Sequence, residues 1–204
     1  MSPSAEPVPA VALVDVSEAL LEQLLELALR DADADEVTPP LGATPGWNTD
    51  RISWFREFHR AAAAGLDGPA GQKSWAISCD GQLAGSVRLR RTDPEPSGAV
   101  GGAGGVMGAG TGGTRGGALG GTRGGTLETG IWLARSFRGH GVGCEALRLV
   151  KDRAAAAGAA VLVAETTAGN MGALALLKSA GAELVTGPAS ETDTVPFKGK
   201  IPLH

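Results

Sequence analysis

The sequence predicts a mixed α/β fold of the α+β kind, in which helices flank a mostly antiparallel sheet that contains one parallel strand pair. Three observations predict it. The Asp80-Gly81 pair separates two extended runs, which is a strong signal for an antiparallel hairpin. A strand, a helix and a second strand follow one another between Leu127 and Glu165, and this order implies a parallel pair. The length of 204 residues, with 43% hydrophobic and 20% charged residues, is typical of one soluble globular domain.

The first elements follow a Pro-rich tail at residues 1–10, so the domain is expected over residues 11–204. Residues 11–14 form a short apolar strand. Ser17 can cap a helix that ends near Arg30, since leucines recur there at helical spacing. The Pro39-Pro40 pair marks a loop, after which Asn48 or Thr49 begins a second helix that stops before Gly65.

The central strands are expected at residues 73–79, 82–91 and 127–134. Between the last two lies a glycine-rich stretch, residues 98–125, which holds 15 glycines in 28 positions. An eight-residue unit occurs there twice, as GGTRGGAL and then GGTRGGTL. This stretch has almost nothing to bury, so we interpret it as a long mobile loop inserted into the domain.

The C-terminal part begins with a helix from Cys144 to about residue 157, which Gly158 ends. A continuous apolar strand follows at residues 160–165. Asn170 or Met171 begins another helix, which ends at residues 180–181. Residues around 185 and 197–203 supply the last strands.

Composition excludes several classes of function. The net charge of −4 argues against a nucleic-acid binder that relies on positive charge. No apolar run approaches the roughly 18 residues of a membrane span, and no secretory signal is evident, so no membrane partner is expected. Two cysteines, Cys79 and Cys144, form no disulfide framework, and a reducing cytoplasm is the simplest location. No cluster predicts a metal site, and the absence of tyrosine removes one common catalytic acid.

The segment RGHGVG, residues 138–143, carries the chemistry. It lies between a strand and a helix, where glycines allow close approach of the backbone and the first N–H groups of the helix have no internal partner. Such a turn can hold a phosphate group. Gly141 to Ala146 also fits the G-x-G-x-x-A fingerprint of dinucleotide-binding oxidoreductases, with Glu165 at a strand end. Against this alternative, residues 135–140 separate the glycines from the strand, and only 39 residues follow Glu165.

The sequence closely resembles the GNAT superfamily of acetyltransferases. Arg138, Gly141 and Gly143 fill the R/Q-x-x-G-x-G/A loop of that superfamily. The preceding ETGIWL, residues 128–133, is similar to the E-x-G-x-W-L strand of the branch that acetylates ribosomal-protein N-termini and small amines. ETTAGN, residues 165–170, and LALLKSAGA, residues 174–182, are similar to the segments that follow.

The resemblance implies a GNAT-like sheet whose parallel pair splays apart, with acetyl-CoA as co-substrate and no metal. Loop amides would hold the pyrophosphate, and the strand before the loop would offer backbone groups to the pantetheine arm. The implied cofactor-binding residues are Ile131, Trp132, Leu133, Arg138, Gly139, His140, Gly141, Val142, Gly143, Cys144 and Asn170.

The implied reaction is direct transfer of the acetyl group to an amine, which must lose a proton to attack. Glu165 is the first candidate for the general base, because its strand position matches a catalytic glutamate of the ribosomal-protein branch. Glu128 is the second candidate. Many members carry a tyrosine, seven residues after the asparagine, that protonates the leaving thiolate, but here that position is Leu177. The general acid is therefore water or another group.

The expected acceptor is the primary amine of a small molecule. An acidic run that includes Asp33, Asp35 and Glu36 would attract a polycationic amine, and Trp47 could stack on a sugar. Analogy with self-protecting enzymes of antibiotic producers suggests an aminoglycoside-like antibiotic, so that the protein would confer resistance. Two alternatives stay open, a protein N-terminal acetyltransferase of the ribosomal-protein type and a non-catalytic module that binds acetyl-CoA. A homodimer is compatible with the sequence.

Overall fold

The computed structural model describes residues 9–92, 125–186 and 195–203. Most of the expected tail and nearly all of the glycine-rich insertion lie outside these residues. Among the described residues, no helix is both long and apolar enough to cross a bilayer. A seven-stranded sheet in the order β1-β2-β3-β4-β5-β7-β6 organises the chain. Its strands are β1 Val11–Asp15, β2 Gln72–Cys79, β3 Gln82–Arg91, β4 Gly125–Leu133, β5 Ala159–Thr167, β6 Glu183–Thr186 and β7 Pro196–Pro202.

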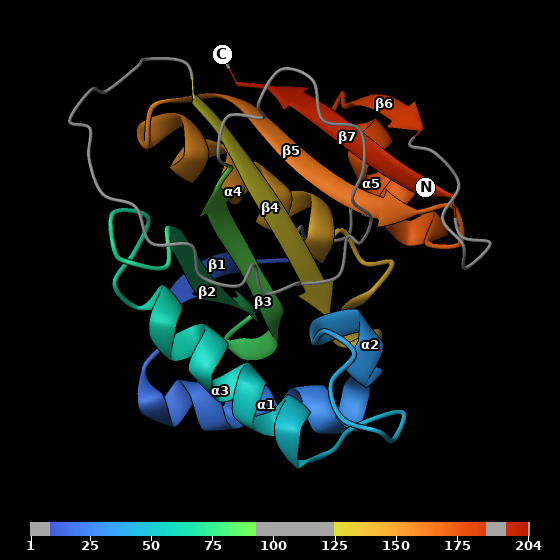
Figure 1. Cartoon of the computed structure of the whole chain (residues 1–204). Coiled ribbons are helices and arrows are strands. Elements are labelled where there is room, and N and C mark those ends of the chain that lie inside the picture. The colour runs from blue at the N-terminus through green and yellow to red at the C-terminus, as the bar shows by residue number, and fades with distance from the viewer. Residues whose placement is uncertain (1–8, 93–124, 187–194, 204) are drawn as a thin grey trace, which may run out of the picture.

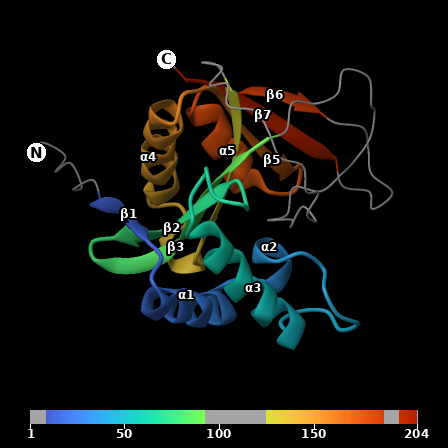
Figure 2. The ribbon, with the colours of Figure 1, turned by 60° about the vertical axis from the view of Figure 1, so that its left-hand side comes forward.

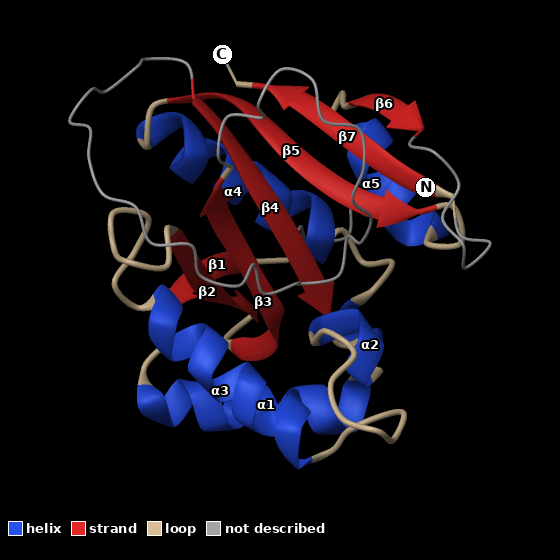
Figure 3. Ribbon diagram, in the orientation of Figure 1, coloured by secondary structure: helices blue, strands red, loops and turns tan. Residues whose placement is uncertain are grey.

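Helices cover both faces of this sheet (Figures 1 and 3). They are α1 Glu18–Asp31, α2 Ala34–Val37, α3 Thr49–Ala62, α4 Val142–Ala156 and α5 Met171–Ser179. Helices α1 and α3 contact β3 and β2, whereas α4 and α5 lie on the other face, which the turned view separates clearly (Figure 2). Side chains along β3 point alternately to these two faces of the sheet. Val87 and Leu89 point into the core with α4, and Ser86 and Arg88 point to the face of α1 and α3.

The predicted hairpin between β2 and β3 is confirmed. Asp80 and Gly81 occupy the turn with φ values of +49° and +78°. Two positive φ values in a two-residue loop are typical of the turn whose twist matches the flanking strands. Asp80 tolerates this conformation because aspartate is one of the few residues besides glycine that adopts it readily.

The parallel pair β4–β5 is confirmed, and it forms a fork. The two strands pair from Gly125 and Ala159 up to Thr129 and Ala164, after which no pairing occurs between them. Strand β4 continues to Leu133 along β3, and β5 continues to Thr167 along β7. The backbone groups that face each other inside the fork are therefore free for a ligand.

The structure differs from the expectation in the acidic run after α1. We expected a loop, but residues 34–37 form the short helix α2, and the Asp33 N–H donates to the Glu36 carboxylate at 3.4 Å. The D-x-x-E spacing that favours such a start was present in the sequence. Helix α4 also begins at Val142, two residues before the expected position.

His59 of α3 is 2% exposed, and its Nδ1 lies 2.9 Å from Ser74 Oγ. Burial lowers the pKa of His59 from 6.5 to about 4. Because the unfolded chain binds a proton at this residue between these values and the folded chain does not, stability should fall as the pH drops from about 6.5 to about 4. The expected loss is about 3 kcal/mol, from about 1.4 kcal/mol per pH unit.

The measurement is the free energy of unfolding by urea between pH 7 and pH 4, in the wild type and in His59→Gln. Glutamine keeps a polar side chain but has no proton to gain. The wild type should lose more stability than the variant over this range. Equal pH slopes would contradict a neutral buried His59.

Candidate active site

The loop between β4 and α4 presents a row of backbone amides. Gly139 and Gly141 have φ values of +79° and +80°, a conformation in which other residues are strained, and Gly141 lies directly before the first turn of α4. Within the described part of the chain, no acceptor is found for the N–H groups of residues 139–144. A Cβ at either glycine would meet nothing within 4 Å. The loop therefore forms an open anion site at a helix N-terminus.

Arg138 ties this loop to its surroundings. Its Nε donates to the Leu133 carbonyl at 2.8 Å, and its two terminal nitrogens lie 3.2 and 2.9 Å from the Glu36 carboxylate. The ion pair is solvent-exposed, and exposed pairs are weak. Arg138 therefore fixes the loop on the end of β4 and retains a guanidinium that can turn toward an anion.

The strand residues assigned to the cofactor lie on the β4 side of the fork. Ile131, Trp132 and Leu133 pair with β3 on one edge, and no described strand pairs with them on the other. Trp132 is only 4% exposed, and its side chain packs in the core beneath α1. Its contribution to a ligand is therefore confined to its backbone.

Asn170 begins α5 close to the end of β5. Its side-chain oxygen accepts the Ala173 N–H at 3.0 Å and so caps the helix. The amide nitrogen of its side chain has no partner among the described residues.

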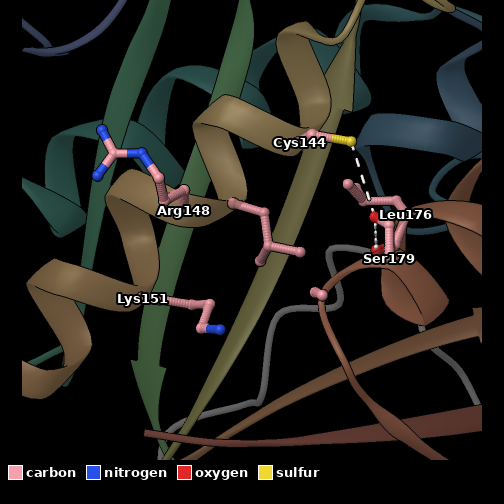
Figure 4. Close-up of a pocket in the computed structure, with 7 residues that line it drawn as sticks. Cys144, Arg148, Lys151, Leu176 and Ser179 are labelled. Atoms are coloured by element: carbon pink, nitrogen blue, oxygen red, sulfur yellow. Dashed lines mark hydrogen bonds between the residues drawn. The ribbon is translucent and has the colours of Figure 1, made fainter. Parts of the chain in front are cut away.

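A groove of about 220 Å³ continues from the loop between α4 and α5 (Figure 4). Cys144 lies at the end of the groove near the loop, and its Sγ is 3.7 Å from Ser179 Oγ. Arg148 and Lys151 line the groove further along α4. Arg148 is held by Glu145 and Asp152. No ion pair of Lys151 is found in the described part of the chain. The groove combines a free cation with apolar walls from Leu147 and Leu176.

Glu165 lies at the vertex of the fork. It is the first residue of β5 beyond the last pair with β4, and its neighbour across the gap is Gly130, which has no side chain. The Glu165 carboxylate is 37% exposed, and Lys198 Nζ approaches it to only 3.6 Å. This carboxylate has free lone pairs and solvent access.

Glu128 differs from Glu165 in its surroundings. Arg88 and Arg90 each donate to one of its oxygens at 2.6 Å, and its side chain is 14% exposed. Both oxygens are thus occupied by guanidinium groups. The geometry makes Glu128 a structural partner of two arginines.

Sequence analysis missed these arginines. Arg88 is 3% exposed, and within residues 9–92, 125–186 and 195–203 no partner is found for its Nε and Nη1 or for Arg90 Nε. Burial lowers the pKa of Arg88, and the charge of Glu128 raises it, with a smaller contribution from Glu165. The alternation in VRLRR, residues 87–91, places two arginines on one face of a strand, and that signal could have revealed them.

The residues assigned to the acceptor are already paired. Asp33 binds Arg135 at 2.9 Å, Asp35 binds Arg51 at 2.6 Å, and Glu36 binds Arg138. The Trp47 indole N–H donates to the Ala32 carbonyl, and its ring contacts Phe55 edge to face. These contacts balance the acidic charge and give Trp47 a packing role.

Three further residues are placed by the structure. His140 and Cys144 are exposed in the loop and at the start of α4. Leu177 is 4% exposed, and its methyl groups lie against Gly199 of β7. No group of three or more potential metal ligands occurs in the described part of the chain.

The comparisons agree with this geometry. A family model described as an acetyltransferase (GNAT) domain matches residues 13–183, so the chain belongs to the GNAT acetyltransferase family and is an acyltransferase. No curated protein matches the sequence.

Solved structures share the fold at low identity. RimL, described as the ribosomal L7/L12 alpha-N-protein acetyltransferase in complex with coenzyme A, has a TM-score of 0.65 at 15% identity, over 97% of both chains. YncA, a putative acetyltransferase from Salmonella typhimurium with acetyl-CoA, has a TM-score of 0.57 at 15% identity, over 97% of this chain and 95% of its own. The microcin C7 self immunity acetyltransferase MccE, in complex with acetyl-CoA and AMP, has a TM-score of 0.62 at 14% identity, over 98% and 97%.

Proposed function

We propose that the protein transfers the acetyl group of acetyl-CoA directly to a primary amine of a small molecule, with Glu165 as the general base. The observation that carries this proposal is the position of a solvent-accessible carboxylate at the vertex of a strand fork, with Lys198 Nζ 3.6 Å away. The fork leads to a loop of unpaired amides at a helix N-terminus. The amides hold the pyrophosphate of the cofactor, and the free backbone groups of β4 hold the pantetheine arm.

The chain supplies the groups that this chemistry needs. The fork holds the thioester beside Glu165, which removes a proton from the ammonium form of the acceptor, directly or through one water. The nitrogen then attacks the thioester carbon, the carbon–sulfur bond breaks to release the thiolate of coenzyme A, and the nitrogen loses its second proton to water as the amide forms. Water protonates the thiolate, since the chain has no tyrosine and Leu177 is in the core.

A protein α-amine is the second candidate acceptor, because RimL is described as acting on a ribosomal protein and shares the fold. An aminoglycoside-like acceptor was suggested by analogy, and the acidic run was expected to attract such a polycation. Arginines neutralise three carboxylates of that run in this structure, so the geometry does not favour a polycation.

The test is a panel of acceptors with acetyl-CoA, read by release of the coenzyme A thiol and by mass spectrometry of the acceptor. The panel contains amino acids, polyamines, aminoglycosides and peptides with a free α-amine. Acetylation of a small amine supports the proposal. Acetyl-CoA binding without transfer to any amine would contradict it, and exclusive transfer to peptides would favour the second candidate.

Lys151 gives a separate prediction about the cofactor. We expect the α4–α5 groove to receive the nucleotide end of coenzyme A, where Lys151 meets the 3′-phosphate. Lys151→Met should weaken coenzyme A binding about tenfold, which is the usual size of a lost charge-assisted hydrogen bond.

The control is dephospho-coenzyme A, which lacks that phosphate. Calorimetry should show that its affinity for wild type and Lys151→Met is the same. An equal loss of affinity for both ligands would mean that Lys151 does not contact the 3′-phosphate.

A further inference from the structure

One row of side chains crosses the sheet at the fork. The strand registers place Arg88 opposite Gly130, and Glu165 opposite Lys198, while Gly130 and Glu165 face each other where the fork opens. Paired residues point to the same face of a sheet, so all four belong to one face. Helix α1 covers this face at Trp132, near the C-terminal end of β4, and the principal contacts of α1 and α3 with the sheet are to β3 and β2. Figure 1 shows these strands beyond the two helices.

The row contains a cation that lacks enough partners. Arg88 and Arg90 share the single carboxylate of Glu128, which leaves a surplus of one positive charge. Among the described residues, the Arg88 side chain makes one hydrogen bond, from Nη2, and its guanidinium lies 5.9 Å from the centre of the Phe58 ring. Its Nε and Nη1 are buried, and no partner for them is found in the same part of the chain. Buried charges are normally paired, so this arrangement lacks an anion.

The position of Arg88 relative to Glu165, the proposed base, indicates which kind of acceptor molecule could contact both residues. Arg88 and Glu165 lie two strands apart, which is about 10 Å between their backbones at ordinary strand spacing, and the opening of the fork beyond Thr129 makes this distance larger. Both residues belong to the same face of the sheet, and the residue between them is a glycine. Because Gly130 has no side chain, β4 places none between the Glu165 carboxylate and the Arg88 guanidinium.

We propose that the acceptor is a small amine that carries a carboxylate a few bonds from its nitrogen, as in an amino acid, and that Arg88 binds this carboxylate. The proposal rests on the proposed acetyl transfer. The acceptor nitrogen lies at Glu165, and its carboxylate supplies the anion that Arg88 and Arg90 lack. An acceptor of this kind has the opposite charge pattern from a polycation.

The test compares amino acids with their amides as acceptors, for example alanine with alaninamide and leucine with leucinamide. The amide keeps the shape and the amine but removes the negative charge. In the wild type the acid should have a kcat/KM about tenfold to a hundredfold above that of its amide, by the usual weight of a charge-assisted hydrogen bond. The amine of the amide is less basic than that of the acid, so a larger fraction of it is unprotonated at neutral pH. This difference favours the amide as acceptor and therefore opposes the expected preference for the acid.

Arg88→Met removes the charge and keeps a long side chain. It should raise KM for the acids by a similar factor, with a smaller change in kcat, and leave the amides nearly unaffected. Arg88→Lys keeps the charge beside Glu128 and should recover much of the activity toward acids. If Arg88 only supports the fold, Arg88→Met lowers the activity toward acids and amides alike, which would overturn the proposal. Arg60→Met, on an exposed ion pair of α3, is the matched control.

A measurement on the wild type covers the case in which the variants do not fold. Propionate should inhibit competitively against alanine, and propionamide should not. Equal inhibition by both, equal use of acids and amides, or a preference for peptides or polyamines would overturn the proposal. These outcomes would contradict the carboxylate-bearing acceptor but not acetyl transfer to an amine. The absence of transfer to every amine would instead contradict the proposed function.

Discussion

Glu165→Gln should lower the turnover number for acetyl transfer at neutral pH by about a hundredfold to ten-thousandfold, the usual contribution of general-base catalysis. Glutamine keeps the size and much of the hydrogen bonding of Glu165 but cannot accept a proton. Acetyl-CoA affinity should hardly change, because Glu165 lies at the vertex of the fork and not at the loop amides. The deficit should shrink as pH rises, since free amine then becomes plentiful without a base.

Glu128→Gln is the matched control for this variant. Its loss leaves Arg88 and Arg90 without a buried counter-charge, so it should lower the free energy of unfolding by roughly 3 kcal/mol while the folded fraction keeps most of its turnover number. A normal turnover number in Glu165→Gln with severe loss in Glu128→Gln would transfer the role of base to Glu128. Normal turnover in both would mean that solvent accepts the proton.

Gly141→Asp should abolish measurable binding of acetyl-CoA at cofactor concentrations that saturate the wild type. The new carboxylate lies beside the amides that hold the pyrophosphate, and like charges at close range in a partly enclosed site repel strongly. The fold should persist, because a Cβ at Gly141 meets nothing within 4 Å.

Gly141→Asn separates charge from shape. Asparagine and aspartate have the same size, and both tolerate a positive φ better than most residues. Calorimetry should show coenzyme A binding to the asparagine variant at least tenfold more tightly than to the aspartate variant. Similar affinity in both would show that crowding and not charge governs the site, and unchanged affinity in both would place the pyrophosphate elsewhere.

Local signals predicted much of the fold. Asp80-Gly81 favours a hairpin through backbone preferences alone, and the strand–helix–strand order around α4 implies a parallel pair because the helix returns the chain to the end of the sheet where the first strand began. The glycine spacing at residues 139–143 indicated the tight turn before α4 for the same reason, since Gly139 and Gly141 adopt φ values above zero there.

Long-range pairing could not be predicted in the same way. Arg138 and Glu36 are 102 residues apart in the chain, as are Arg135 and Asp33, so no local pattern announces that these charges neutralise each other. The acidic run was therefore interpreted as free charge. The Arg88–Glu128–Arg90 group depends on the β3–β4 register across the glycine-rich insertion, and that register emerges only from the folded sheet.

A single-turnover experiment tests direct transfer at the fork most directly. The complex of enzyme and acetyl-CoA is mixed with the acceptor amine that the panel identifies, quenched at intervals, and analysed for free coenzyme A thiol and for acetylated amine. Direct transfer predicts that both products appear together, in equal amounts and at one rate, and that Glu165→Gln slows both alike. Thiol released before the acetylated amine, or without it, would contradict the account, because it would require an acetyl-enzyme intermediate or simple hydrolysis.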